Sequence, residues 1–279
     1  MIDLIMIVLA LSVLITASIQ DLKKREVMDW LNFGLIASAL LIRTSFSSIT
    51  GDWSYFLNGI YGLLIGVALA YLMFYTGQWG GGDSKLLMGM GALIGYSTFL
   101  FIFMINIFLL GAVYGLIYTI ILAIRKRKQF VKEFALLFKQ NKLTHRILLL
   151  VCLVLVFATY FVDYLLKLPL LMIIVLSLSM FYLFLFTKSV EKSCMLKYYN
   201  PMKLTEGDWI AKDVKYKGKY LAGPKDLGID KKQIKLIQSL YKKGKIKQIL
   251  VKEGIPFVPS FLFAYIFTYA IGNYLPMFF

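Results

Sequence analysis

The chain has 279 residues, 59% of them hydrophobic, with a formal net charge of +16 and a mean hydropathy of +0.74. Its apolar runs are long enough to cross a hydrocarbon core of about 30 Å, which predicts a multi-pass membrane protein and excludes a soluble globular enzyme. Because Cys152 and Cys194 form no CxxC pair, we expect neither a disulfide framework nor a cysteine metal site.

The first predicted span covers residues 2–20, and the basic residues 23–25 follow it. Basic residues mark cytoplasmic ends, so this end is expected in the cytoplasm and the N-terminus outside. Asp3 precedes the span and no small-residue cleavage site follows it, which favours a retained helix over a removed signal peptide.

Two stripes along the predicted spans indicate helix packing. Polar residues recur every four positions from Ser12 to Gln20, and we expect this face of the first span to meet other helices. In the third span Gly62, Gly66 and Ala70 have the same spacing, which lets another backbone come close.

Seven more membrane helices follow the first span. They are expected at residues 29–46, 54–76, 83–96, 98–124, 147–166, 170–187 and 256–275. The helix at 83–96 is too short to cross alone, and Pro169 is expected at the turn between the two helices that flank it.

Residues 125–146 are rich in lysine and arginine, with Phe130, Phe134 and Leu137 at helical spacing. This pattern is typical of a helix that lies on the inner membrane surface, and it predicts contacts with anionic lipid headgroups. A solvated connector is the alternative.

A long polar segment at residues 188–253 precedes the last span. We expect a hairpin from Val214 to Leu221 around a Lys217-Gly218 turn, then a helix capped by Asp230, then a strand at 246–251. These elements predict a small cytoplasmic α/β lobe.

The elements together predict an all-α polytopic membrane protein with about eight membrane helices, one of them short, and a small α/β lobe. Residues 1–187 and the last helix at 254–279 form the membrane region, and 188–253 form the lobe. Of the 31 lysines and arginines, we expect only Arg43 and Lys167 in outside loops. Membrane orientation therefore explains the positive charge, so we expect no nucleic-acid partner and both termini outside.

Two acids lie at the cytoplasmic ends of different predicted helices. Asp21 closes the first span, and Asp83 opens the short helix. A carboxylate at membrane depth is costly and is a candidate functional group. Two carboxylates held close together cannot both ionise, so one can take a proton from water while the other polarises a peptide carbonyl. Such a pair predicts an aspartyl dyad.

No rival site is evident. His145 is the single histidine and lies in a basic stretch, so a Ser/His/Asp triad and a histidine metal cluster are not expected. We interpret His145 as structural, and we expect no metal or cofactor.

Asp83 directly follows three glycines, Gly80, Gly81 and Gly82. Glycine tolerates positive φ and leaves room for another backbone, so an extended substrate could pair with this segment. The alternative is a tight turn in which Asp83 is an ordinary N-cap.

The two acidic segments resemble signature regions of a known family. Residues 20–29, QDLKKREVMD, and residues 80–89, GGGDSKLLMG, resemble those of the type IV prepilin peptidases. These are membrane aspartyl proteases with a GxGD motif, and the archaeal preflagellin peptidases belong to the same family. Residues 255–259, IPFVP, also resemble the start of that family's last helix.

The resemblance implies that Asp21 and Asp83 are the catalytic pair. It also implies cleavage of a basic leader from type IV prepilin-like or archaellin precursors at the cytoplasmic membrane surface. The bacterial enzymes often carry an N-terminal cysteine-containing region and methylate the new N-terminus. Because no CxxC or methyl-donor site is evident, we predict a peptidase without methyltransferase activity. The helices at 147–187 and the lobe exceed the compact preflagellin form, which favours a prepilin substrate.

A basic leader must bind a basic cytoplasmic face, so long-range attraction cannot explain recognition. We expect Glu26 and Asp29 to meet the leader's charges locally. Alternatively, Asp29 caps the second helix and Glu26 pairs with a lysine. Lys85 is expected to reach lipid phosphate or the substrate, and Asp208 to be a turn residue of the lobe.

Two other classes use intramembrane acids. An ion-coupled transporter is expected to show inverted repeats and acids at mid-bilayer, whereas no repeat is evident and both acids lie at helix ends. A presenilin-type protease pairs GxGD with a Tyr-Asp and a Pro-Ala-Leu motif, neither of which stands at matching positions.

Overall fold

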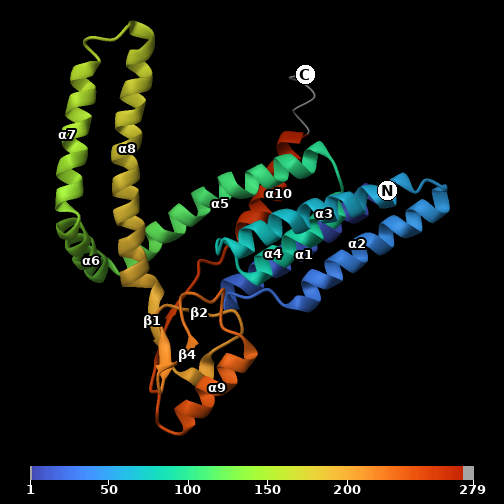
Figure 1. Cartoon of the computed structure of the whole chain (residues 1–279). Coiled ribbons are helices and arrows are strands. Elements are labelled where there is room, and N and C mark those ends of the chain that lie inside the picture. Colours follow the sequence, from blue (N-terminus) through green and yellow to red (C-terminus); the bar gives the residue numbers. More distant parts are fainter. Residues whose placement is uncertain (1, 273–279) are drawn as a thin grey trace.

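The computed structural model describes residues 2–272 and shows membrane helices joined to a small lobe (Figure 1). The helices are α1 (Ile2–Lys24), α2 (Asp29–Thr50), α3 (Ser54–Tyr75), α4 (Gly81–Ile94), α5 (Thr98–Arg125), α6 (Arg127–Gln140), α7 (Lys142–Ala158), α8 (Tyr164–Val190), α9 (Lys231–Lys242) and α10 (Val258–Gly272). Within the described residues α1, α2, α3, α5 and α8 are long and apolar enough to cross a membrane. The predicted fold class, an all-α polytopic membrane protein with a small lobe, is therefore confirmed.

The expected helices are all present, with shifted ends. Pro169 was predicted at the turn between α7 and α8, but that turn is at residues 159–163 and Pro169 lies near the start of α8. Pro169 is the sixth residue of α8 and has no N–H to donate to the carbonyl four residues earlier, so it removes one helical hydrogen bond. The part of the expected last span at 273–275 lies outside the described residues.

The polar stripe of α1 does not face other helices, contrary to the prediction. Ser12 and Thr16 are exposed, and their hydroxyls bond the carbonyls of Leu9 and Ser12 in their own helix. A serine or threonine satisfied in this way can face lipid without a partner. The buried face of α1 carries Ser18 and Asp21 instead.

The small-residue seam of α3 is confirmed as a packing surface against α4. Gly62, Gly66 and Ala70 are buried. A Cβ added at Gly62 would overlap the Gly91 carbonyl oxygen of α4, and one at Gly66 would lie 3.0 Å from the Leu87 oxygen. The two helices therefore meet backbone to backbone.

The sequence predicted Arg43 in an outside loop, but it is buried within α2 and binds the end of α4. Its Nε and Nη2 donate to the carbonyls of Ala92 and Leu93 at 3.0 and 2.8 Å, and Nη1 donates to the Tyr55 carbonyl at 2.8 Å. Lys167, the other predicted loop residue, lies in the first turn of α8. With 14 residues, α4 spans only about 21 Å, less than the roughly 30 Å of a hydrocarbon core, and its last carbonyls need partners outside the helix. A cation placed there satisfies those carbonyls and the negative end of the helix dipole.

The last helix joins the first part of the chain. α10 packs against α1 and α5, and Asn106 donates to the Thr268 hydroxyl at 2.9 Å across the buried α5–α10 contact. Interhelical hydrogen bonds of this kind hold membrane helices together.

A hairpin of α7 and α8 stands apart from α1–α4 (Figure 1). α6 is a helix, as the pattern at 125–146 predicted, and it packs on α8: Leu137 is buried and Phe130 lies 5.5 Å from Phe186. His145 packs beside the same helix, with Nε2 3.0 Å from the Tyr182 hydroxyl.

The lobe contains β1 (Leu196–Tyr199), β2 (Trp209–Ile210), β3 (Val214–Tyr216), β4 (Lys219–Ala222) and β5 (Ile249–Lys252). β5 lies between β1 and β2 and is antiparallel to both. The predicted β3–β4 hairpin is confirmed. The predicted helix cap is confirmed as well: the Asp230 side chain accepts a hydrogen bond of 2.6 Å from the Gln233 N–H and caps α9. The α8 helix passes through a π-helical turn at Glu191–Met195 before β1 begins.

We expect Gly62→Val to destabilise the membrane region by about 1–3 kcal/mol, because it overpacks the α3–α4 contact. Gly115→Val is the matched control, since a Cβ at Gly115 of α5 meets nothing within 4 Å. Thermal unfolding in detergent measures both variants. Equal melting temperatures would contradict the proposed role of the seam.

Arg43→Met should destabilise the protein by roughly 3–5 kcal/mol, because buried carbonyls at the end of α4 lose a charged donor. Arg43→Lys should restore only part of this, since an ammonium cannot reproduce the guanidinium fork. The same melting experiment tests both, and full rescue by lysine would show that charge alone suffices.

Candidate active site

Asp21 lies in the last turn of α1 with its side chain buried. Its Oδ2 accepts a hydrogen bond of 2.8 Å from the backbone N–H of Val258, the first residue of α10. A helix N-terminus carries unsatisfied N–H groups and a positive partial charge, so it favours a carboxylate. Asp21 therefore caps α10 from a helix at the other end of the chain.

Asp83 lies in the first turn of α4 and is half-buried. Its Oδ2 accepts from the Gly80 N–H at 3.2 Å, so Gly80, not Asp83, is the N-cap residue. The carboxylate reaches back to the start of its own helix, as the third residue of a capping box does.

The glycine run does not form an extended edge for a substrate strand, which corrects that expectation. Gly81 and Gly82 are helical, Gly80 has φ −73°, and its N–H already bonds Asp83. Gly82 does need to be small, because a Cβ there would lie 3.3 Å from the Val27 nitrogen. The backbone that approaches the glycines is therefore the chain's own α1–α2 connection.

The fold brings the two acids together. α1, whose last turn carries Asp21, contacts α4, whose first turn carries Asp83. Each carboxylate faces a helix N-terminus, α10 for Asp21 and α4 for Asp83. The two helix N-termini can stabilise negative charge on both acids.

Three other predicted site residues, Glu26, Asp29 and Lys85, make different contacts. Lys85 binds Asp29 with Nζ 2.5 Å from Oδ1, so Lys85 links α4 to α2. Asp29 is the first residue of α2 and does not cap it, since the N-cap is Met28. Glu26 is exposed and lies within Coulombic range of Asp208 in the lobe.

Asp208 is a turn residue, as predicted, and its Oδ2 accepts from the Thr205 N–H at 2.8 Å. Burial is the main cause that raises the pKa of Asp208, and the charges of Glu26 and Glu253 raise it further.

Aromatic side chains anchor the loop that precedes the glycine run. Trp79 is buried, stacks on Phe108 of α5 at 5.7 Å between ring centroids, and lies 5.3 Å from Phe261 of α10. The tryptophan next to the glycines was visible in the sequence, but its partners could not be predicted because they are distant in the chain. This packing fixes the start of α4 against α5 and α10.

Three buried polar side chains near the acids were also missed from the sequence. Within the described residues, Ser18 Oγ, Asn32 Oδ1 and Ser84 Oγ have no hydrogen-bond partner. Ser84 follows Asp83, Ser18 lies one turn before Asp21, and Asn32 Nδ2 donates to the Gly82 carbonyl at 3.4 Å. Buried polar atoms normally bind protein or ordered water, so these three are suited to bind water beside the acids.

The region that contains the two acidic segments matches a known protein family. Residues 8–116 match the Type IV leader peptidase family, and this region contains Asp21 and Asp83. The predicted resemblance is therefore confirmed for the part of the chain from α1 into α5. Val258 lies outside the matched region.

Three curated relatives carry the name preflagellin peptidase. The proteins of Methanococcus voltae and Methanocaldococcus jannaschii are 44% and 42% identical to this chain over 81 residues, which is 29% of this chain and 34% of each relative. The protein of Methanococcus maripaludis is 44% identical over 82 residues, which is 29% of this chain and 35% of the relative. The match thus spans about a third of the length of these relatives. No solved structure matches the chain significantly.

Proposed function

We propose that the protein is a membrane aspartyl endopeptidase that removes the basic leader from type IV prepilin-like or archaellin precursors. One observation carries the proposal: Asp21 and Asp83 lie on two helices that contact one another, α1 and α4, inside the region that matches the leader peptidase family. Three relatives named preflagellin peptidase support the same activity.

The chemistry needs a water molecule between Asp21 and Asp83. Mutual repulsion keeps one of two close carboxylates protonated, so the ionised one takes a proton from water while the protonated one donates to the peptide carbonyl. Ser18 and Ser84 supply polar atoms next to this water. The protein acts as a peptidase without methyl transfer.

The acids face the cytoplasm in this proposal. Residues 23–25 are basic and directly follow Asp21, which orients the end of α1 inward and the N-terminus outward. The exposed basic residues of α6 contact anionic lipid headgroups on the same side.

In this proposal Glu26 and Asp208, and not Asp29, bind the basic leader. Asp29 is already paired with Lys85, whereas Glu26 and Asp208 repel one another. A cationic leader side chain between these two acids relieves their repulsion. The local acids thus select a basic leader on a face that is otherwise positive.

Asp21→Asn and Asp83→Asn should each abolish cleavage, because neither variant retains two ionisable groups for the water. Cleavage is measured in membranes as a mobility shift of a prepilin and a preflagellin substrate at matched expression. Asp163→Asn is the control, since Asp163 is an exposed acid before α8. Retained cleavage in either dyad variant would remove that residue from the mechanism.

Glu26→Lys should lower kcat/KM for a basic leader about two- to five-fold, as expected for partly exposed charges, and leave a neutral leader unaffected. Asp29→Lys should reduce cleavage of both leaders equally, because it removes the ion pair between Asp29 of α2 and Lys85 of α4. Steady-state cleavage of matched basic and neutral peptides separates these cases. Equal loss on both leaders for Glu26→Lys would contradict its role in recognition.

A further inference from the structure

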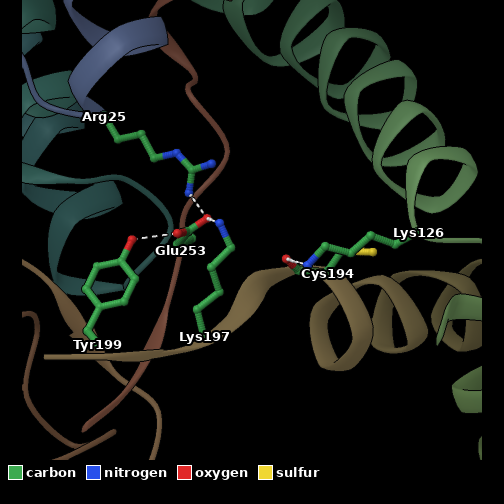
Figure 2. Close-up of polar contacts among 6 residues, drawn as sticks. All are labelled: Arg25, Lys126, Cys194, Lys197, Tyr199 and Glu253. Carbon is green, nitrogen blue, oxygen red and sulfur yellow. Dashed lines mark hydrogen bonds and ion pairs between the residues drawn. The ribbon is translucent and has the colours of Figure 1, made fainter. Parts of the chain in front are cut away.

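Glu253 lies between β5 and α10, and its carboxylate binds three other side chains (Figure 2). Oε2 is 2.5 Å from Arg25 Nη1 and 2.7 Å from Lys197 Nζ. Oε1 accepts from the Tyr199 hydroxyl at 2.5 Å. Lys197 and Tyr199 alternate along β1 and so share one face of that strand. Glu253 thus connects the lobe to the residue that follows α1.

The network holds Glu253 in its ionised form. Burial alone would raise the pKa of Glu253, but hydrogen bonds from Lys197, Tyr199 and Arg25 outweigh it and lower that pKa. The hydrogen bond to Glu253 in turn raises the pKa of Tyr199 to about 12. Glu253 therefore stays ionised at neutral pH and keeps its attraction to Arg25 and Lys197.

Two chain segments run from this network directly to Asp21. The backbone N–H of Arg25 donates to the Asp21 carbonyl at 2.8 Å. On the other side, residues 254–257 connect Glu253 to Val258, whose N–H donates to the Asp21 carboxylate. Glu253 is thus the point at which both segments that bind Asp21 are joined.

Arg25 has an unfavourable backbone conformation, and its side chain binds Glu253. Arg25 has φ +58° just after the end of α1, a position that glycine occupies at the lowest cost. Any residue with a Cβ is strained there. An arginine at this position keeps a strained backbone and, in return, provides the guanidinium that binds Glu253.

The lobe also touches the segment that leads to Asp83. A Cβ added at Gly77 would lie 3.2 Å from the Trp209 ring of β2, so this loop lies directly against the lobe. Both acids are therefore connected to one small sheet, Asp21 through Glu253 and Asp83 through residues 77–80.

We propose that Glu253 is a positioning residue for Asp21: anchored to the lobe by Lys197 and Tyr199, it sets the Asp21 carboxylate through Arg25 and through residues 254–258. The inference rests on the proposed function, because it takes Asp21 as one of the catalytic acids. It assigns the lobe the task of fixing the separation between the two acids.

Glu253→Gln keeps the size of the side chain and removes its charge. Because a misplacement of about 1 Å can cost on the order of 100-fold in rate, we expect kcat to fall about 10- to 100-fold with KM changed less than about two-fold. Glu191→Gln is the matched control, since Glu191 also binds two lysines, Lys188 and Lys252, but has no link to Arg25. An effect on KM that disappears with a neutral leader would instead make Glu253 a leader-binding residue and overturn the proposal.

Arg25→Gly is the second variant, and it guards against simple unfolding. Glycine relieves the backbone strain, so the melting temperature should not fall, yet kcat should fall as in Glu253→Gln. Lys217→Gly is its control, because Lys217 also has positive φ, +48°, but lies in the β3–β4 turn. Unchanged kcat in Arg25→Gly would overturn the proposal.

Hydrogen exchange gives a readout that does not depend on cleavage. In Glu253→Gln and Arg25→Gly the peptide that contains Val258 should exchange faster than in wild type, whereas the Glu191→Gln and Lys217→Gly controls should not differ. If the wild type cleaves no substrate but exchange changes as expected, the proposed function fails and the structural link stands. Unchanged exchange in both test variants would overturn the link itself.

Discussion

The hydrogen bond from the Val258 amide to the buried Asp21 carboxylate joins the last helix of the chain to the first. A carboxylate at this depth is stable only where the structure supplies donors and positive charge, and the start of α10 supplies both. α10 can stand there because it packs on α1 and α5 and because Gly111 of α5 leaves room for Phe257. The position of this acid is therefore a property of the whole membrane region.

A comparable constraint governs α4, a helix too short to cross the membrane. Both of its ends leave backbone groups that have no partner within the helix. At one end Asp83 binds the Gly80 N–H, and at the other Arg43 binds the Ala92 and Leu93 carbonyls. An anion at the N-terminus and a cation at the C-terminus match the helix dipole, so the acid of the proposed dyad also contributes to the stability of the helix that carries it.

The parts of the structure that could be predicted from the sequence are those set by local pattern. Hydropathy located the helices, the Lys217-Gly218 turn located the hairpin, and the motifs around Asp21 and Asp83 located the acids. The contacts of Arg43 and Val258 could not be predicted, because they join segments far apart in the chain and have no periodic signal. The stripe from Ser12 failed for a different reason: hydroxyls can be satisfied by carbonyls of their own helix, so polarity alone does not indicate which face is buried.

The lobe explains how a site at the membrane surface can keep two acids at a defined separation. Helices in lipid lack a strong hydrophobic drive to associate, so their cytoplasmic ends need another constraint. The antiparallel sheet of β1, β5 and β2 provides one, since β1 begins directly after the π-helical turn that follows α8, and β5 ends six residues before Val258. Charged groups in this sheet remain near water, where an ion pair costs less to form than in the membrane core. A junction built around Glu253 can therefore hold the acids in place without burying additional charge among the helices.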